Sequence, residues 1–179
     1  MNRSRIRSCC LQRRSPGSTP AGARSSRIGS VTEPIHETTA FFMPDLAPEL
    51  LVDNLAASLE FWVGLCGFEV AYDRPEDGFA YLASGTAHVM LEQAGIGRNW
   101  IPAPLDRPLG RGVNFQINVP SIDPLIDRLA AHGWPLFLAP EVKWYRTGAT
   151  EVGLAQFLVQ DPDGYLLRFS ARLPAGSTP

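Results

Sequence analysis

The sequence has few cysteines and few histidines, and it lacks long apolar runs. Its three cysteines, two of them adjacent at Cys9 and Cys10, exclude a disulfide framework and the C-x-x-C spacing of a structural zinc site. Its three histidines include no pair at metal-ligand spacing. No segment approaches the ~20 consecutive apolar residues of a membrane-spanning helix, and the start lacks the apolar stretch of a secretory signal. These absences predict a cytoplasmic protein with no membrane partner.

Charge is distributed unevenly along the chain. Residues 1–42 contain seven arginines and two acidic residues among Ser, Gly and Pro, without an apolar period, and such a composition predicts disorder. The whole chain has 16 basic and 18 acidic residues, so residues 43–179 retain 9 and 16, a formal charge of −7. An arginine-rich arm can bind nucleic acid or serve as a transit peptide. We interpret this one as a flexible extension without a nucleic-acid partner, with Met43 as a candidate for the true start.

The same order of elements occurs twice after Met43. The first unit, residues 45–93, has a strand (ELLV), a helix (LAASLEFWVGLCG, capped by Asp53-Asn54 and ended by Gly67) and three strands (FEVAYD, GFAYLAS, AHVMLEQ). A Pro- and Gly-rich connector spans residues 94–111. The second unit, residues 112–173, has a strand (VNFQINV), a helix (IDPLIDRLAAHG, capped by Ser121) and three strands (PLFLAP, EVGLAQFLV, YLLRFSA).

This duplication predicts the fold. Each unit has one helix, which covers one face of its small sheet and leaves the other face open. We therefore predict an α+β domain over residues 43–179, in which two tandem βαβββ modules form a curved eight-stranded sheet around a concave cleft, with the helices outside. Such a cleft is a natural site for a small-molecule ligand.

Three motifs carry a resemblance to a known family: LEFWVGLCGFEV after the first strand, VMLEQ at the end of the first unit and DPDGYLLRF at the end of the second. They resemble the vicinal oxygen chelate superfamily, also called the glyoxalase/bleomycin-resistance/dioxygenase fold, and within it the bleomycin-resistance proteins. The resemblance covers about residues 45–173 and implies a homodimer.

Metal-dependent members of that superfamily place His, Gln or Glu ligands at four inward positions. The resemblance puts Ala47, Met90, Asn114 and Arg168 at these positions. None of the four is a usual ligand, and a guanidinium repels a divalent ion. The resemblance therefore implies a site with no metal and no cofactor.

Strand alternation predicts which side chains line the cleft. In VNFQINV, Val113, Phe115, Ile117 and Val119 should pack on the helices, so the polar residues between them should face inward. The aromatic residues of the connector and of the segment before the seventh strand are expected at the mouth of the cleft, where they can stack on a planar ligand. The candidate ligand-binding residues are Glu49, Tyr81, His88, Met90, Glu92, Trp100, Asn114, Gln116, Trp144, Tyr145 and Arg168.

Two of these side chains leave alternatives open. Arg168 needs a hydrogen-bonding partner, which is either Glu49 or Glu92 in the resting protein or an anionic or carbonyl group of a ligand. His88 is either a hydrogen-bonded cleft residue or, with Glu49 or Glu92, part of an irregular metal or acid–base site.

Two functions fit these observations. The first is non-catalytic binding and sequestration of a bleomycin-type glycopeptide antibiotic in a metal-free cleft shared across a homodimer, which confers resistance and needs no catalytic residue. The acidic domain favours it, because these glycopeptides are cationic. The alternative is a metal-independent or atypical-metal lyase or dioxygenase of the same superfamily, acting on a small oxygenated substrate.

Overall fold

The computed structural model describes residues 43–97, 99–174 and 176–177. The chain divides into two units, Met1–Thr39 and Ala40–Pro179, and the described residues all belong to the second. The disorder expected for residues 1–42 therefore lies outside the described residues.

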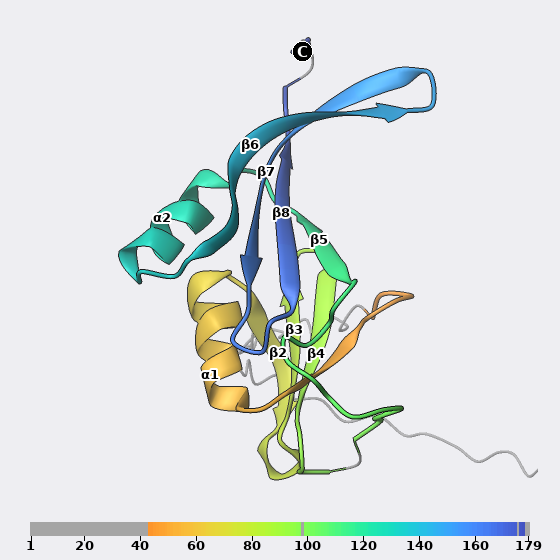
Figure 1. Cartoon of the computed structure of the whole chain (residues 1–179), viewed down its shortest axis with the longest axis vertical. Helices are drawn as coiled ribbons and strands as arrows, with labels where there is room; N and C mark the ends of the chain where they lie inside the picture. Colours follow the sequence, from red (N-terminus) through yellow and green to blue (C-terminus); the bar gives the residue numbers. More distant parts are fainter. Residues whose placement is uncertain (1–42, 98, 175, 178–179) are drawn as a thin grey trace, which may run out of the picture. The chain divides into compact units, whose positions relative to one another are not determined.

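The second unit contains the predicted βαβββ order twice (Figure 1). The elements of the first module are β1 (Glu49–Val52), α1 (Leu55–Leu59), the π-helix η1 (Glu60–Leu65), β2 (Glu69–Arg74), the 3-10 turn η2 (Pro75–Asp77), β3 (Phe79–Ser84) and β4 (Ala87–Gln93). Those of the second are β5 (Asn114–Asn118), α2 (Asp123–Ala131), β6 (Leu136–Thr147), β7 (Thr150–Gln160) and β8 (Leu166–Arg172). The predicted α+β fold with two modules is confirmed.

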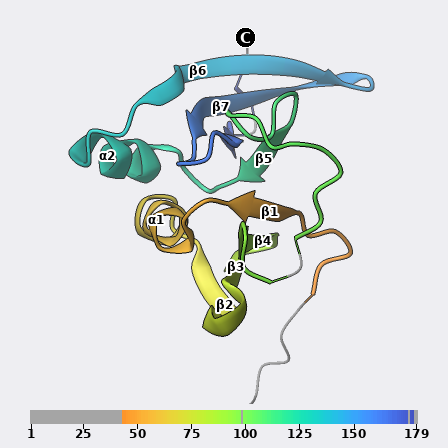
Figure 2. The same ribbon diagram turned by 60° about the horizontal axis from the view of Figure 1, so that its bottom comes forward.

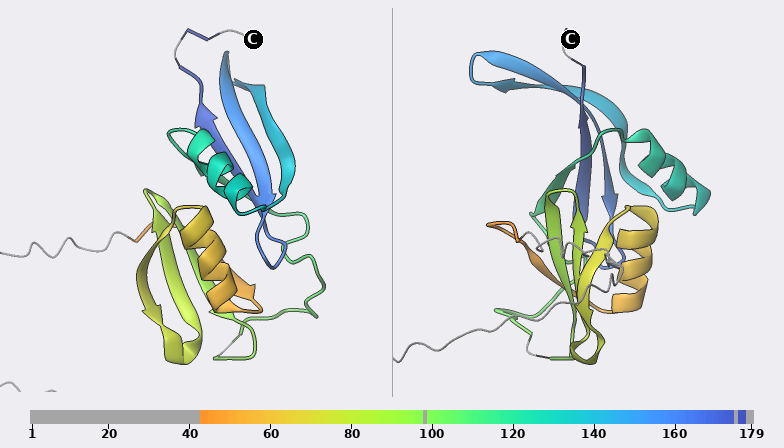
Figure 3. Two further views of the ribbon diagram at one scale, coloured as in Figure 1. Left: turned by 90° about the vertical axis from the view of Figure 1, so that its left-hand side faces the viewer. Right: turned by 180° about the vertical axis from the view of Figure 1, so that it is seen from behind.

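Hydrogen bonding divides the described strands into two four-stranded sheets, with the orders β1-β4-β3-β2 and β5-β8-β7-β6. In each sheet the first strand of the module pairs in parallel with the last, and the remaining pairs are antiparallel. The eight strands are those expected from the sequence, but no ladder joins the two sheets into one among the described residues. Each helix covers one face of its own sheet (Figure 3).

The first helix changes its winding part-way along. Asn54 caps α1, since its Oδ1 accepts a hydrogen bond from the N–H of Ala57 at 3.0 Å. The following turns are wider, as the 3.0 Å bond from the N–H of Cys66 to the carbonyl of Phe61 shows. This π-helix places Phe61 and Trp62 in the core, each about 1% exposed. Gly67, at φ +75°, then ends the helix, as the sequence predicts.

The core contains buried apolar residues of both modules, and the strands alternate as predicted. Leu50, Leu91, Leu167 and Phe169 are buried, and the polar residues between them point away from the helices. Ile117 follows the same rule in β5. Val113 does not, because β5 begins one residue later and leaves Val113 51% exposed.

The DPDG turn between β7 and β8 ties the two modules together. Asp161 Oδ2 accepts a hydrogen bond from Trp62 Nε1 (3.2 Å), and its Oδ1 accepts the N–H groups of Asp163, Gly164 and Tyr165. Asp163 in turn reaches residues at the start of α1. Gly164 has φ +99°, and a Cβ there would lie 2.4 Å from Pro108 Cβ, so only glycine allows the connector to approach this turn.

The β6–β7 hairpin is longer than the sequence predicts. We expected β6 to stop at Pro140, with Trp144 and Tyr145 in a loop, but β6 pairs with β7 as far as Thr147 (Figure 2). Pro140 is tolerated because β6 is an edge strand and the pairing register shifts between Leu138 and Glu141. Trp144 and Tyr145 are therefore strand residues on opposite faces.

No helix among the described residues is both long enough and apolar enough to cross a bilayer.

Candidate ligand-binding site

The open face of the second sheet is organised around Arg168. β5 and β8 pair with Gln116 opposite Arg168, and Arg168 Nη2 donates a hydrogen bond to Gln116 Oε1. The guanidinium carbon lies 5.8 Å from the centroid of the Tyr145 ring. Arg168 Nε is buried without a hydrogen-bond partner. Of the two alternatives for Arg168, pairing with Glu49 or Glu92 does not occur among the described residues, because the neighbouring strand supplies a neutral amide at the matching register.

Gln116 continues this polar network along the sheet. Its Nε2 donates to Asn118 Oδ1 (3.1 Å) and to Ser170 Oγ (3.2 Å), and Ser170 Oγ donates to the same Asn118 oxygen (2.9 Å). Because Oε1 accepts from Arg168 while Nε2 donates to these oxygens, the orientation of the Gln116 amide is defined at both ends. The guanidinium is thereby held in position on the sheet face.

A second group of polar side chains lies beside this network on β6 and β7. Gln156, which is 3% exposed, donates from Nε2 to Glu141 Oε1 at 2.7 Å, and its Oε1 accepts from the Tyr145 hydroxyl at 3.1 Å. The sequence reasoning missed Glu141 and Gln156. Alternation along EVGLAQFLV offered a signal for Gln156, whereas Glu141 fell in the segment that was assigned to a loop.

On the first sheet an aromatic row includes the buried residues Phe79 and Tyr81, which are 5% and 1% exposed. The Tyr72 ring stacks on Tyr81, with centroids 5.0 Å apart and planes 20° apart, and Tyr72 also stacks on Phe79 at 6.0 Å. His88 also contacts Tyr81 edge-on, with ring centroids 5.6 Å apart and its Nδ1 3.2 Å from the Tyr81 hydroxyl oxygen. Met90 lies opposite Tyr81 in the ladder and is half-buried. His88 is thus a hydrogen-bonded face residue.

A cavity of about 270 Å³ joins the beginning of β4 to β5 and brings His88 beside Asn114 and Gln116. Its apolar walls come from both modules and include Trp62, Phe68, Phe115 and Ile117. Three of the predicted ligand-binding residues are therefore gathered in one place.

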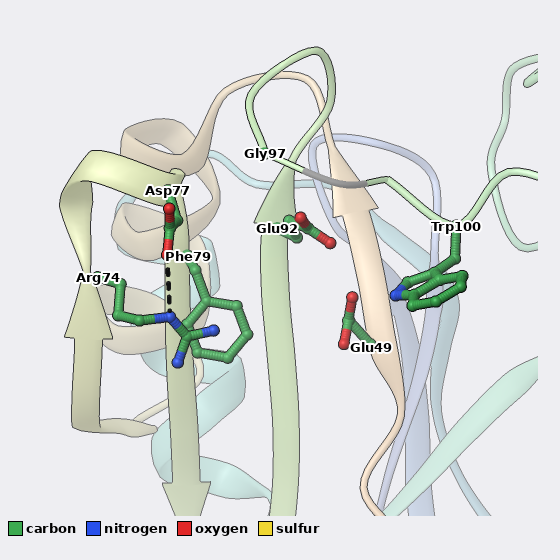
Figure 4. A pocket seen from close by; sticks show the side chains of 7 residues that line it. All are labelled: Glu49, Arg74, Asp77, Phe79, Glu92, Gly97 and Trp100. Atoms are coloured by element: carbon green, nitrogen blue, oxygen red, sulfur yellow. Dashed lines mark hydrogen bonds and ion pairs between the residues drawn. The ribbon is translucent and has the colours of Figure 1, made fainter.

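A second cavity, of about 350 Å³, opens at the other end of β4 (Figure 4). It is lined by Glu49, Arg74, Asp77, Phe79, Glu92, Gly97 and Trp100. Arg74 Nε is 3.2 Å from Asp77 Oδ2, and the guanidinium carbon lies 3.7 Å from the centroid of the Phe79 ring. Arg74 and Asp77 were missed, because RPEDG was interpreted only as a turn.

The candidate residues therefore fall into separate places. Arg168, Gln116 and Tyr145 form the network on the second sheet, whereas Glu49, Glu92 and Trp100 line the cavity of Figure 4. Trp144 belongs to neither. It packs against Gly153 and lines a surface pocket with the C-terminal segment, where its ring would meet a Cβ at position 153 within 2.9 Å.

The structure gives little support to metal binding by these side chains. In the described part of the chain, no three or more His, Cys, Asp or Glu residues are grouped so that they could hold a metal ion. The expected alternative, His88 with Glu49 or Glu92, is not such a group, because His88 faces Tyr81. At the four ligand positions of metal-dependent relatives, Met90 offers a thioether, Asn114 one amide oxygen, Arg168 a cation and Ala47 nothing. This donor set does not fit a divalent metal.

Comparison with known proteins identifies the family to which this fold belongs. Residues 39–169 match the model of a family described as the Glyoxalase/Bleomycin resistance protein/Dioxygenase superfamily. A superfamily member of that description from Vibrio splendidus 12B01 shares 39% sequence identity over 70% of this chain and 95% of its own, with a TM-score of 0.32. The curated proteins provide no match.

Two further solved structures are similar in fold. TioX from Micromonospora sp. ML1 is 23% identical, covers 71% of this chain and 98% of its own, and has a TM-score of 0.55. A virulence protein from Salmonella typhimurium is 18% identical, covers 74% of this chain and 100% of its own, and has a TM-score of 0.53.

Proposed function

Because this chain belongs to the glyoxalase/bleomycin resistance protein/dioxygenase superfamily, we propose that it binds and sequesters a bleomycin-type cationic glycopeptide without transforming it. The observation that carries the proposal is the Arg168–Gln116 pair. Arg168 stands at one of the positions where metal-dependent relatives place a His, Gln or Glu ligand, and the pair supplies the sheet face with hydrogen-bonding groups suited to holding a ligand.

The negative charge of the domain supports binding of a cationic ligand. The domain over residues 43–179 has a formal charge of −7, which attracts a cation at long range. That attraction is screened over about 8 Å at physiological salt, so affinity should fall as salt rises. Arg168 is then left for the amide and carbonyl groups of the ligand, toward which the guanidinium N–H groups that Gln116 does not use can donate.

The test is calorimetry with metal-free bleomycin on the full-length protein. We expect binding that weakens with salt and quenches tryptophan fluorescence, with Trp100, which is 67% exposed, as the reporter. Replacing Arg168 by Ala should cost about 1–3 kcal/mol of binding free energy. Arg172→Ala, at an exposed position on the same strand, is the matched control.

The outcome also separates the two functional classes. Bleomycin recovered after long incubation should be chemically unchanged by mass spectrometry. No heat and no quenching with a known resistance protein binding in parallel, or a modified ligand, would favour the metal-independent enzyme instead.

We also propose that the working form is a homodimer. The candidate residues of one chain lie in several separate places, so a second copy that covers a sheet face would enclose a ligand between subunits. Light scattering at micromolar concentration is expected to give twice the chain mass. A monomer mass under these conditions would contradict this part of the proposal.

A further inference from the structure

The side chain of Gln156 is buried on the open face of the second sheet. It is 3% exposed, and the ladder places it directly opposite Ser170 on β8 and Glu141 on β6. Asn118 on β5 lies opposite Ser170, so one row of polar side chains crosses all four strands. Taking an amide out of water costs free energy unless hydrogen bonds replace those made to water. The partners of Gln156 therefore show what this buried side chain holds.

Glu141 fixes the orientation of the Gln156 amide. Nε2 of Gln156 donates to Glu141 Oε1 at 2.7 Å, and an ionised carboxylate can only accept. The amide is thereby held beside Tyr145, whose hydroxyl oxygen lies 3.1 Å from Gln156 Oε1 and 2.9 Å from Nε2. The Tyr145 hydroxyl is thus bonded to an amide that is buried and held at its other end.

The Tyr145 ring and Gln116 support Arg168 from two different strands. The guanidinium carbon lies 5.8 Å from the centroid of the Tyr145 ring, within the range of a cation–π contact. Gln116 accepts from Arg168 Nη2 and is itself bonded to Asn118 and Ser170. Tyr145 belongs to β6 and Gln116 to β5, the two edge strands of the sheet. Arg168, on β8 between these edges, is held by both.

This support leaves one edge of the guanidinium for a ligand. Arg168 Nε is buried, with no hydrogen-bond partner among the described residues, so its N–H group is enclosed by the protein. Nη2 uses one of its hydrogens on Gln116, and the other Nη2 hydrogen and those of Nη1 remain. Two N–H groups side by side match the geometry of a planar acceptor such as a carboxylate or an amide carbonyl.

We propose that Gln156 is a positioning residue of the ligand site. Through the Tyr145 hydroxyl it holds the aromatic ring against Arg168, so that the Nη1–Nη2 edge of the guanidinium is presented to a planar carboxylate or carbonyl group of the ligand. The proposal rests on the proposed function, which assigns Arg168 to the ligand, and it adds the residue that fixes the guanidinium. Glu141 acts one step further away, on the Gln156 amide.

The test measures the affinity of full-length Gln156→Met for bleomycin by calorimetry. Methionine is similar in length and makes no such hydrogen bond to Tyr145, so affinity should fall about fivefold. Tyr145→Phe keeps the ring and removes the hydroxyl, and it should cause a similar loss. Gln160→Met is the matched control, because it makes the same substitution on the same strand, where the glutamine donates to the carbonyl of Gly164. Its affinity should not change.

A double-mutant cycle separates positioning from a general structural effect. The Arg168→Ala variant has no guanidinium to position, so adding Gln156→Met to it should cause no further loss of affinity. Additive losses in the double variant would overturn the proposal. If Gln156→Met does not fold, Tyr145→Phe in the same cycle makes the same comparison, since it removes only the hydroxyl.

The Nε–H group of Arg168 gives a second readout that needs no ligand. Because Nε is buried, its proton should exchange slowly with water in nuclear magnetic resonance spectra, and the signal is assigned by its absence from Arg168→Ala. Gln156→Met should speed this exchange at least about threefold, because the guanidinium loses one support. Gln160→Met should leave it unchanged. The same exchange rate in Gln156→Met as in the unmodified protein would show that Gln156 does not hold Arg168.

The two proposals fail separately. Faster Nε–H exchange in Gln156→Met, without any binding of bleomycin, sustains the role of Gln156 toward Arg168 and contradicts the proposed ligand. Bleomycin binding that Gln156→Met leaves unchanged sustains sequestration and overturns the positioning role.

Discussion

Replacing Asp163 by Ala is expected to lower the free energy of unfolding by about 3–4 kcal/mol. Asp163 is 3% exposed and belongs to the second module, but its Oδ1 accepts the N–H of Asp53 (3.0 Å) and its Oδ2 the hydroxyl of Ser58 (3.3 Å). Both donors belong to the first module, at the start of α1. Removing the carboxylate leaves the fully buried Ser58 hydroxyl without its acceptor. Arg107, half exposed, donates to the same carboxylate at 2.8 Å and can return to water.

Urea denaturation of the full-length protein measures this effect. Asp163→Asn keeps one carbonyl oxygen, so its free energy of unfolding should fall by about half as much as that of the alanine variant. Asp53→Ala removes only the exposed partner of Arg107 and should cost less than about 1 kcal/mol. A double-mutant cycle with Ser58→Ala should show coupling between the two positions. If Asp163→Ala costs no more than Asp53→Ala, this carboxylate does not hold the modules together.

Stability should also depend on the protonation of Asp161. Burial raises the pKa of this carboxyl from 3.8 to about 6, while the N–H groups of Tyr165, Trp62 and Asp163 act in the opposite direction. The folded protein therefore binds a proton more tightly than the unfolded chain. The stability that Asp161 contributes is fully present below about pH 4 and is lost as the pH rises through about 6. The raised pKa corresponds to a decrease of about 3 kcal/mol in the free energy of unfolding.

The Asp161→Asn variant isolates this effect, because it does not titrate. The free energy of unfolding of the unmodified protein, minus that of Asp161→Asn, should fall by about 3 kcal/mol between about pH 4 and 7. A constant offset is expected in addition, since an Asn amide cannot both accept the backbone N–H groups and accept from Trp62 Nε1. Asp45→Asn, at an exposed position, serves as the control.

A further variant checks the cause of the shift. Trp62→Phe removes the indole N–H that lowers the pKa of Asp161. In this variant the free energy of unfolding should therefore fall at a higher pH. A difference between the unmodified protein and Asp161→Asn that stays flat over this pH range would show that Asp161 is ionised at a normal pKa.

Much of the fold follows from local patterns. The period of the helix after Asn54, the alternation in VNFQINV and the turn residues of DPDG all act between near neighbours in the chain, and the structure contains each of them. The repetition of the unit predicts two open sheet faces in the same way. The widened turns of η1 have no such local signal, because they depend on where Phe61 and Trp62 pack.

For the candidate site, too, the sequence predicts some features and not others. Alternation alone places Gln116, Arg168 and Glu92 on the open faces, since the side-chain direction in a strand depends only on parity. Which side chains then meet depends on strand order and register, which bring together residues 52 positions apart. The pairing of β5 with β8 therefore gives Arg168 a glutamine instead of a glutamate, and the pairing of β1 with β4 places Glu92 diagonal to Glu49 on one face. The face of a strand to which each side chain points follows from the sequence. Which side chains contact each other depends on the long-range packing of the two modules.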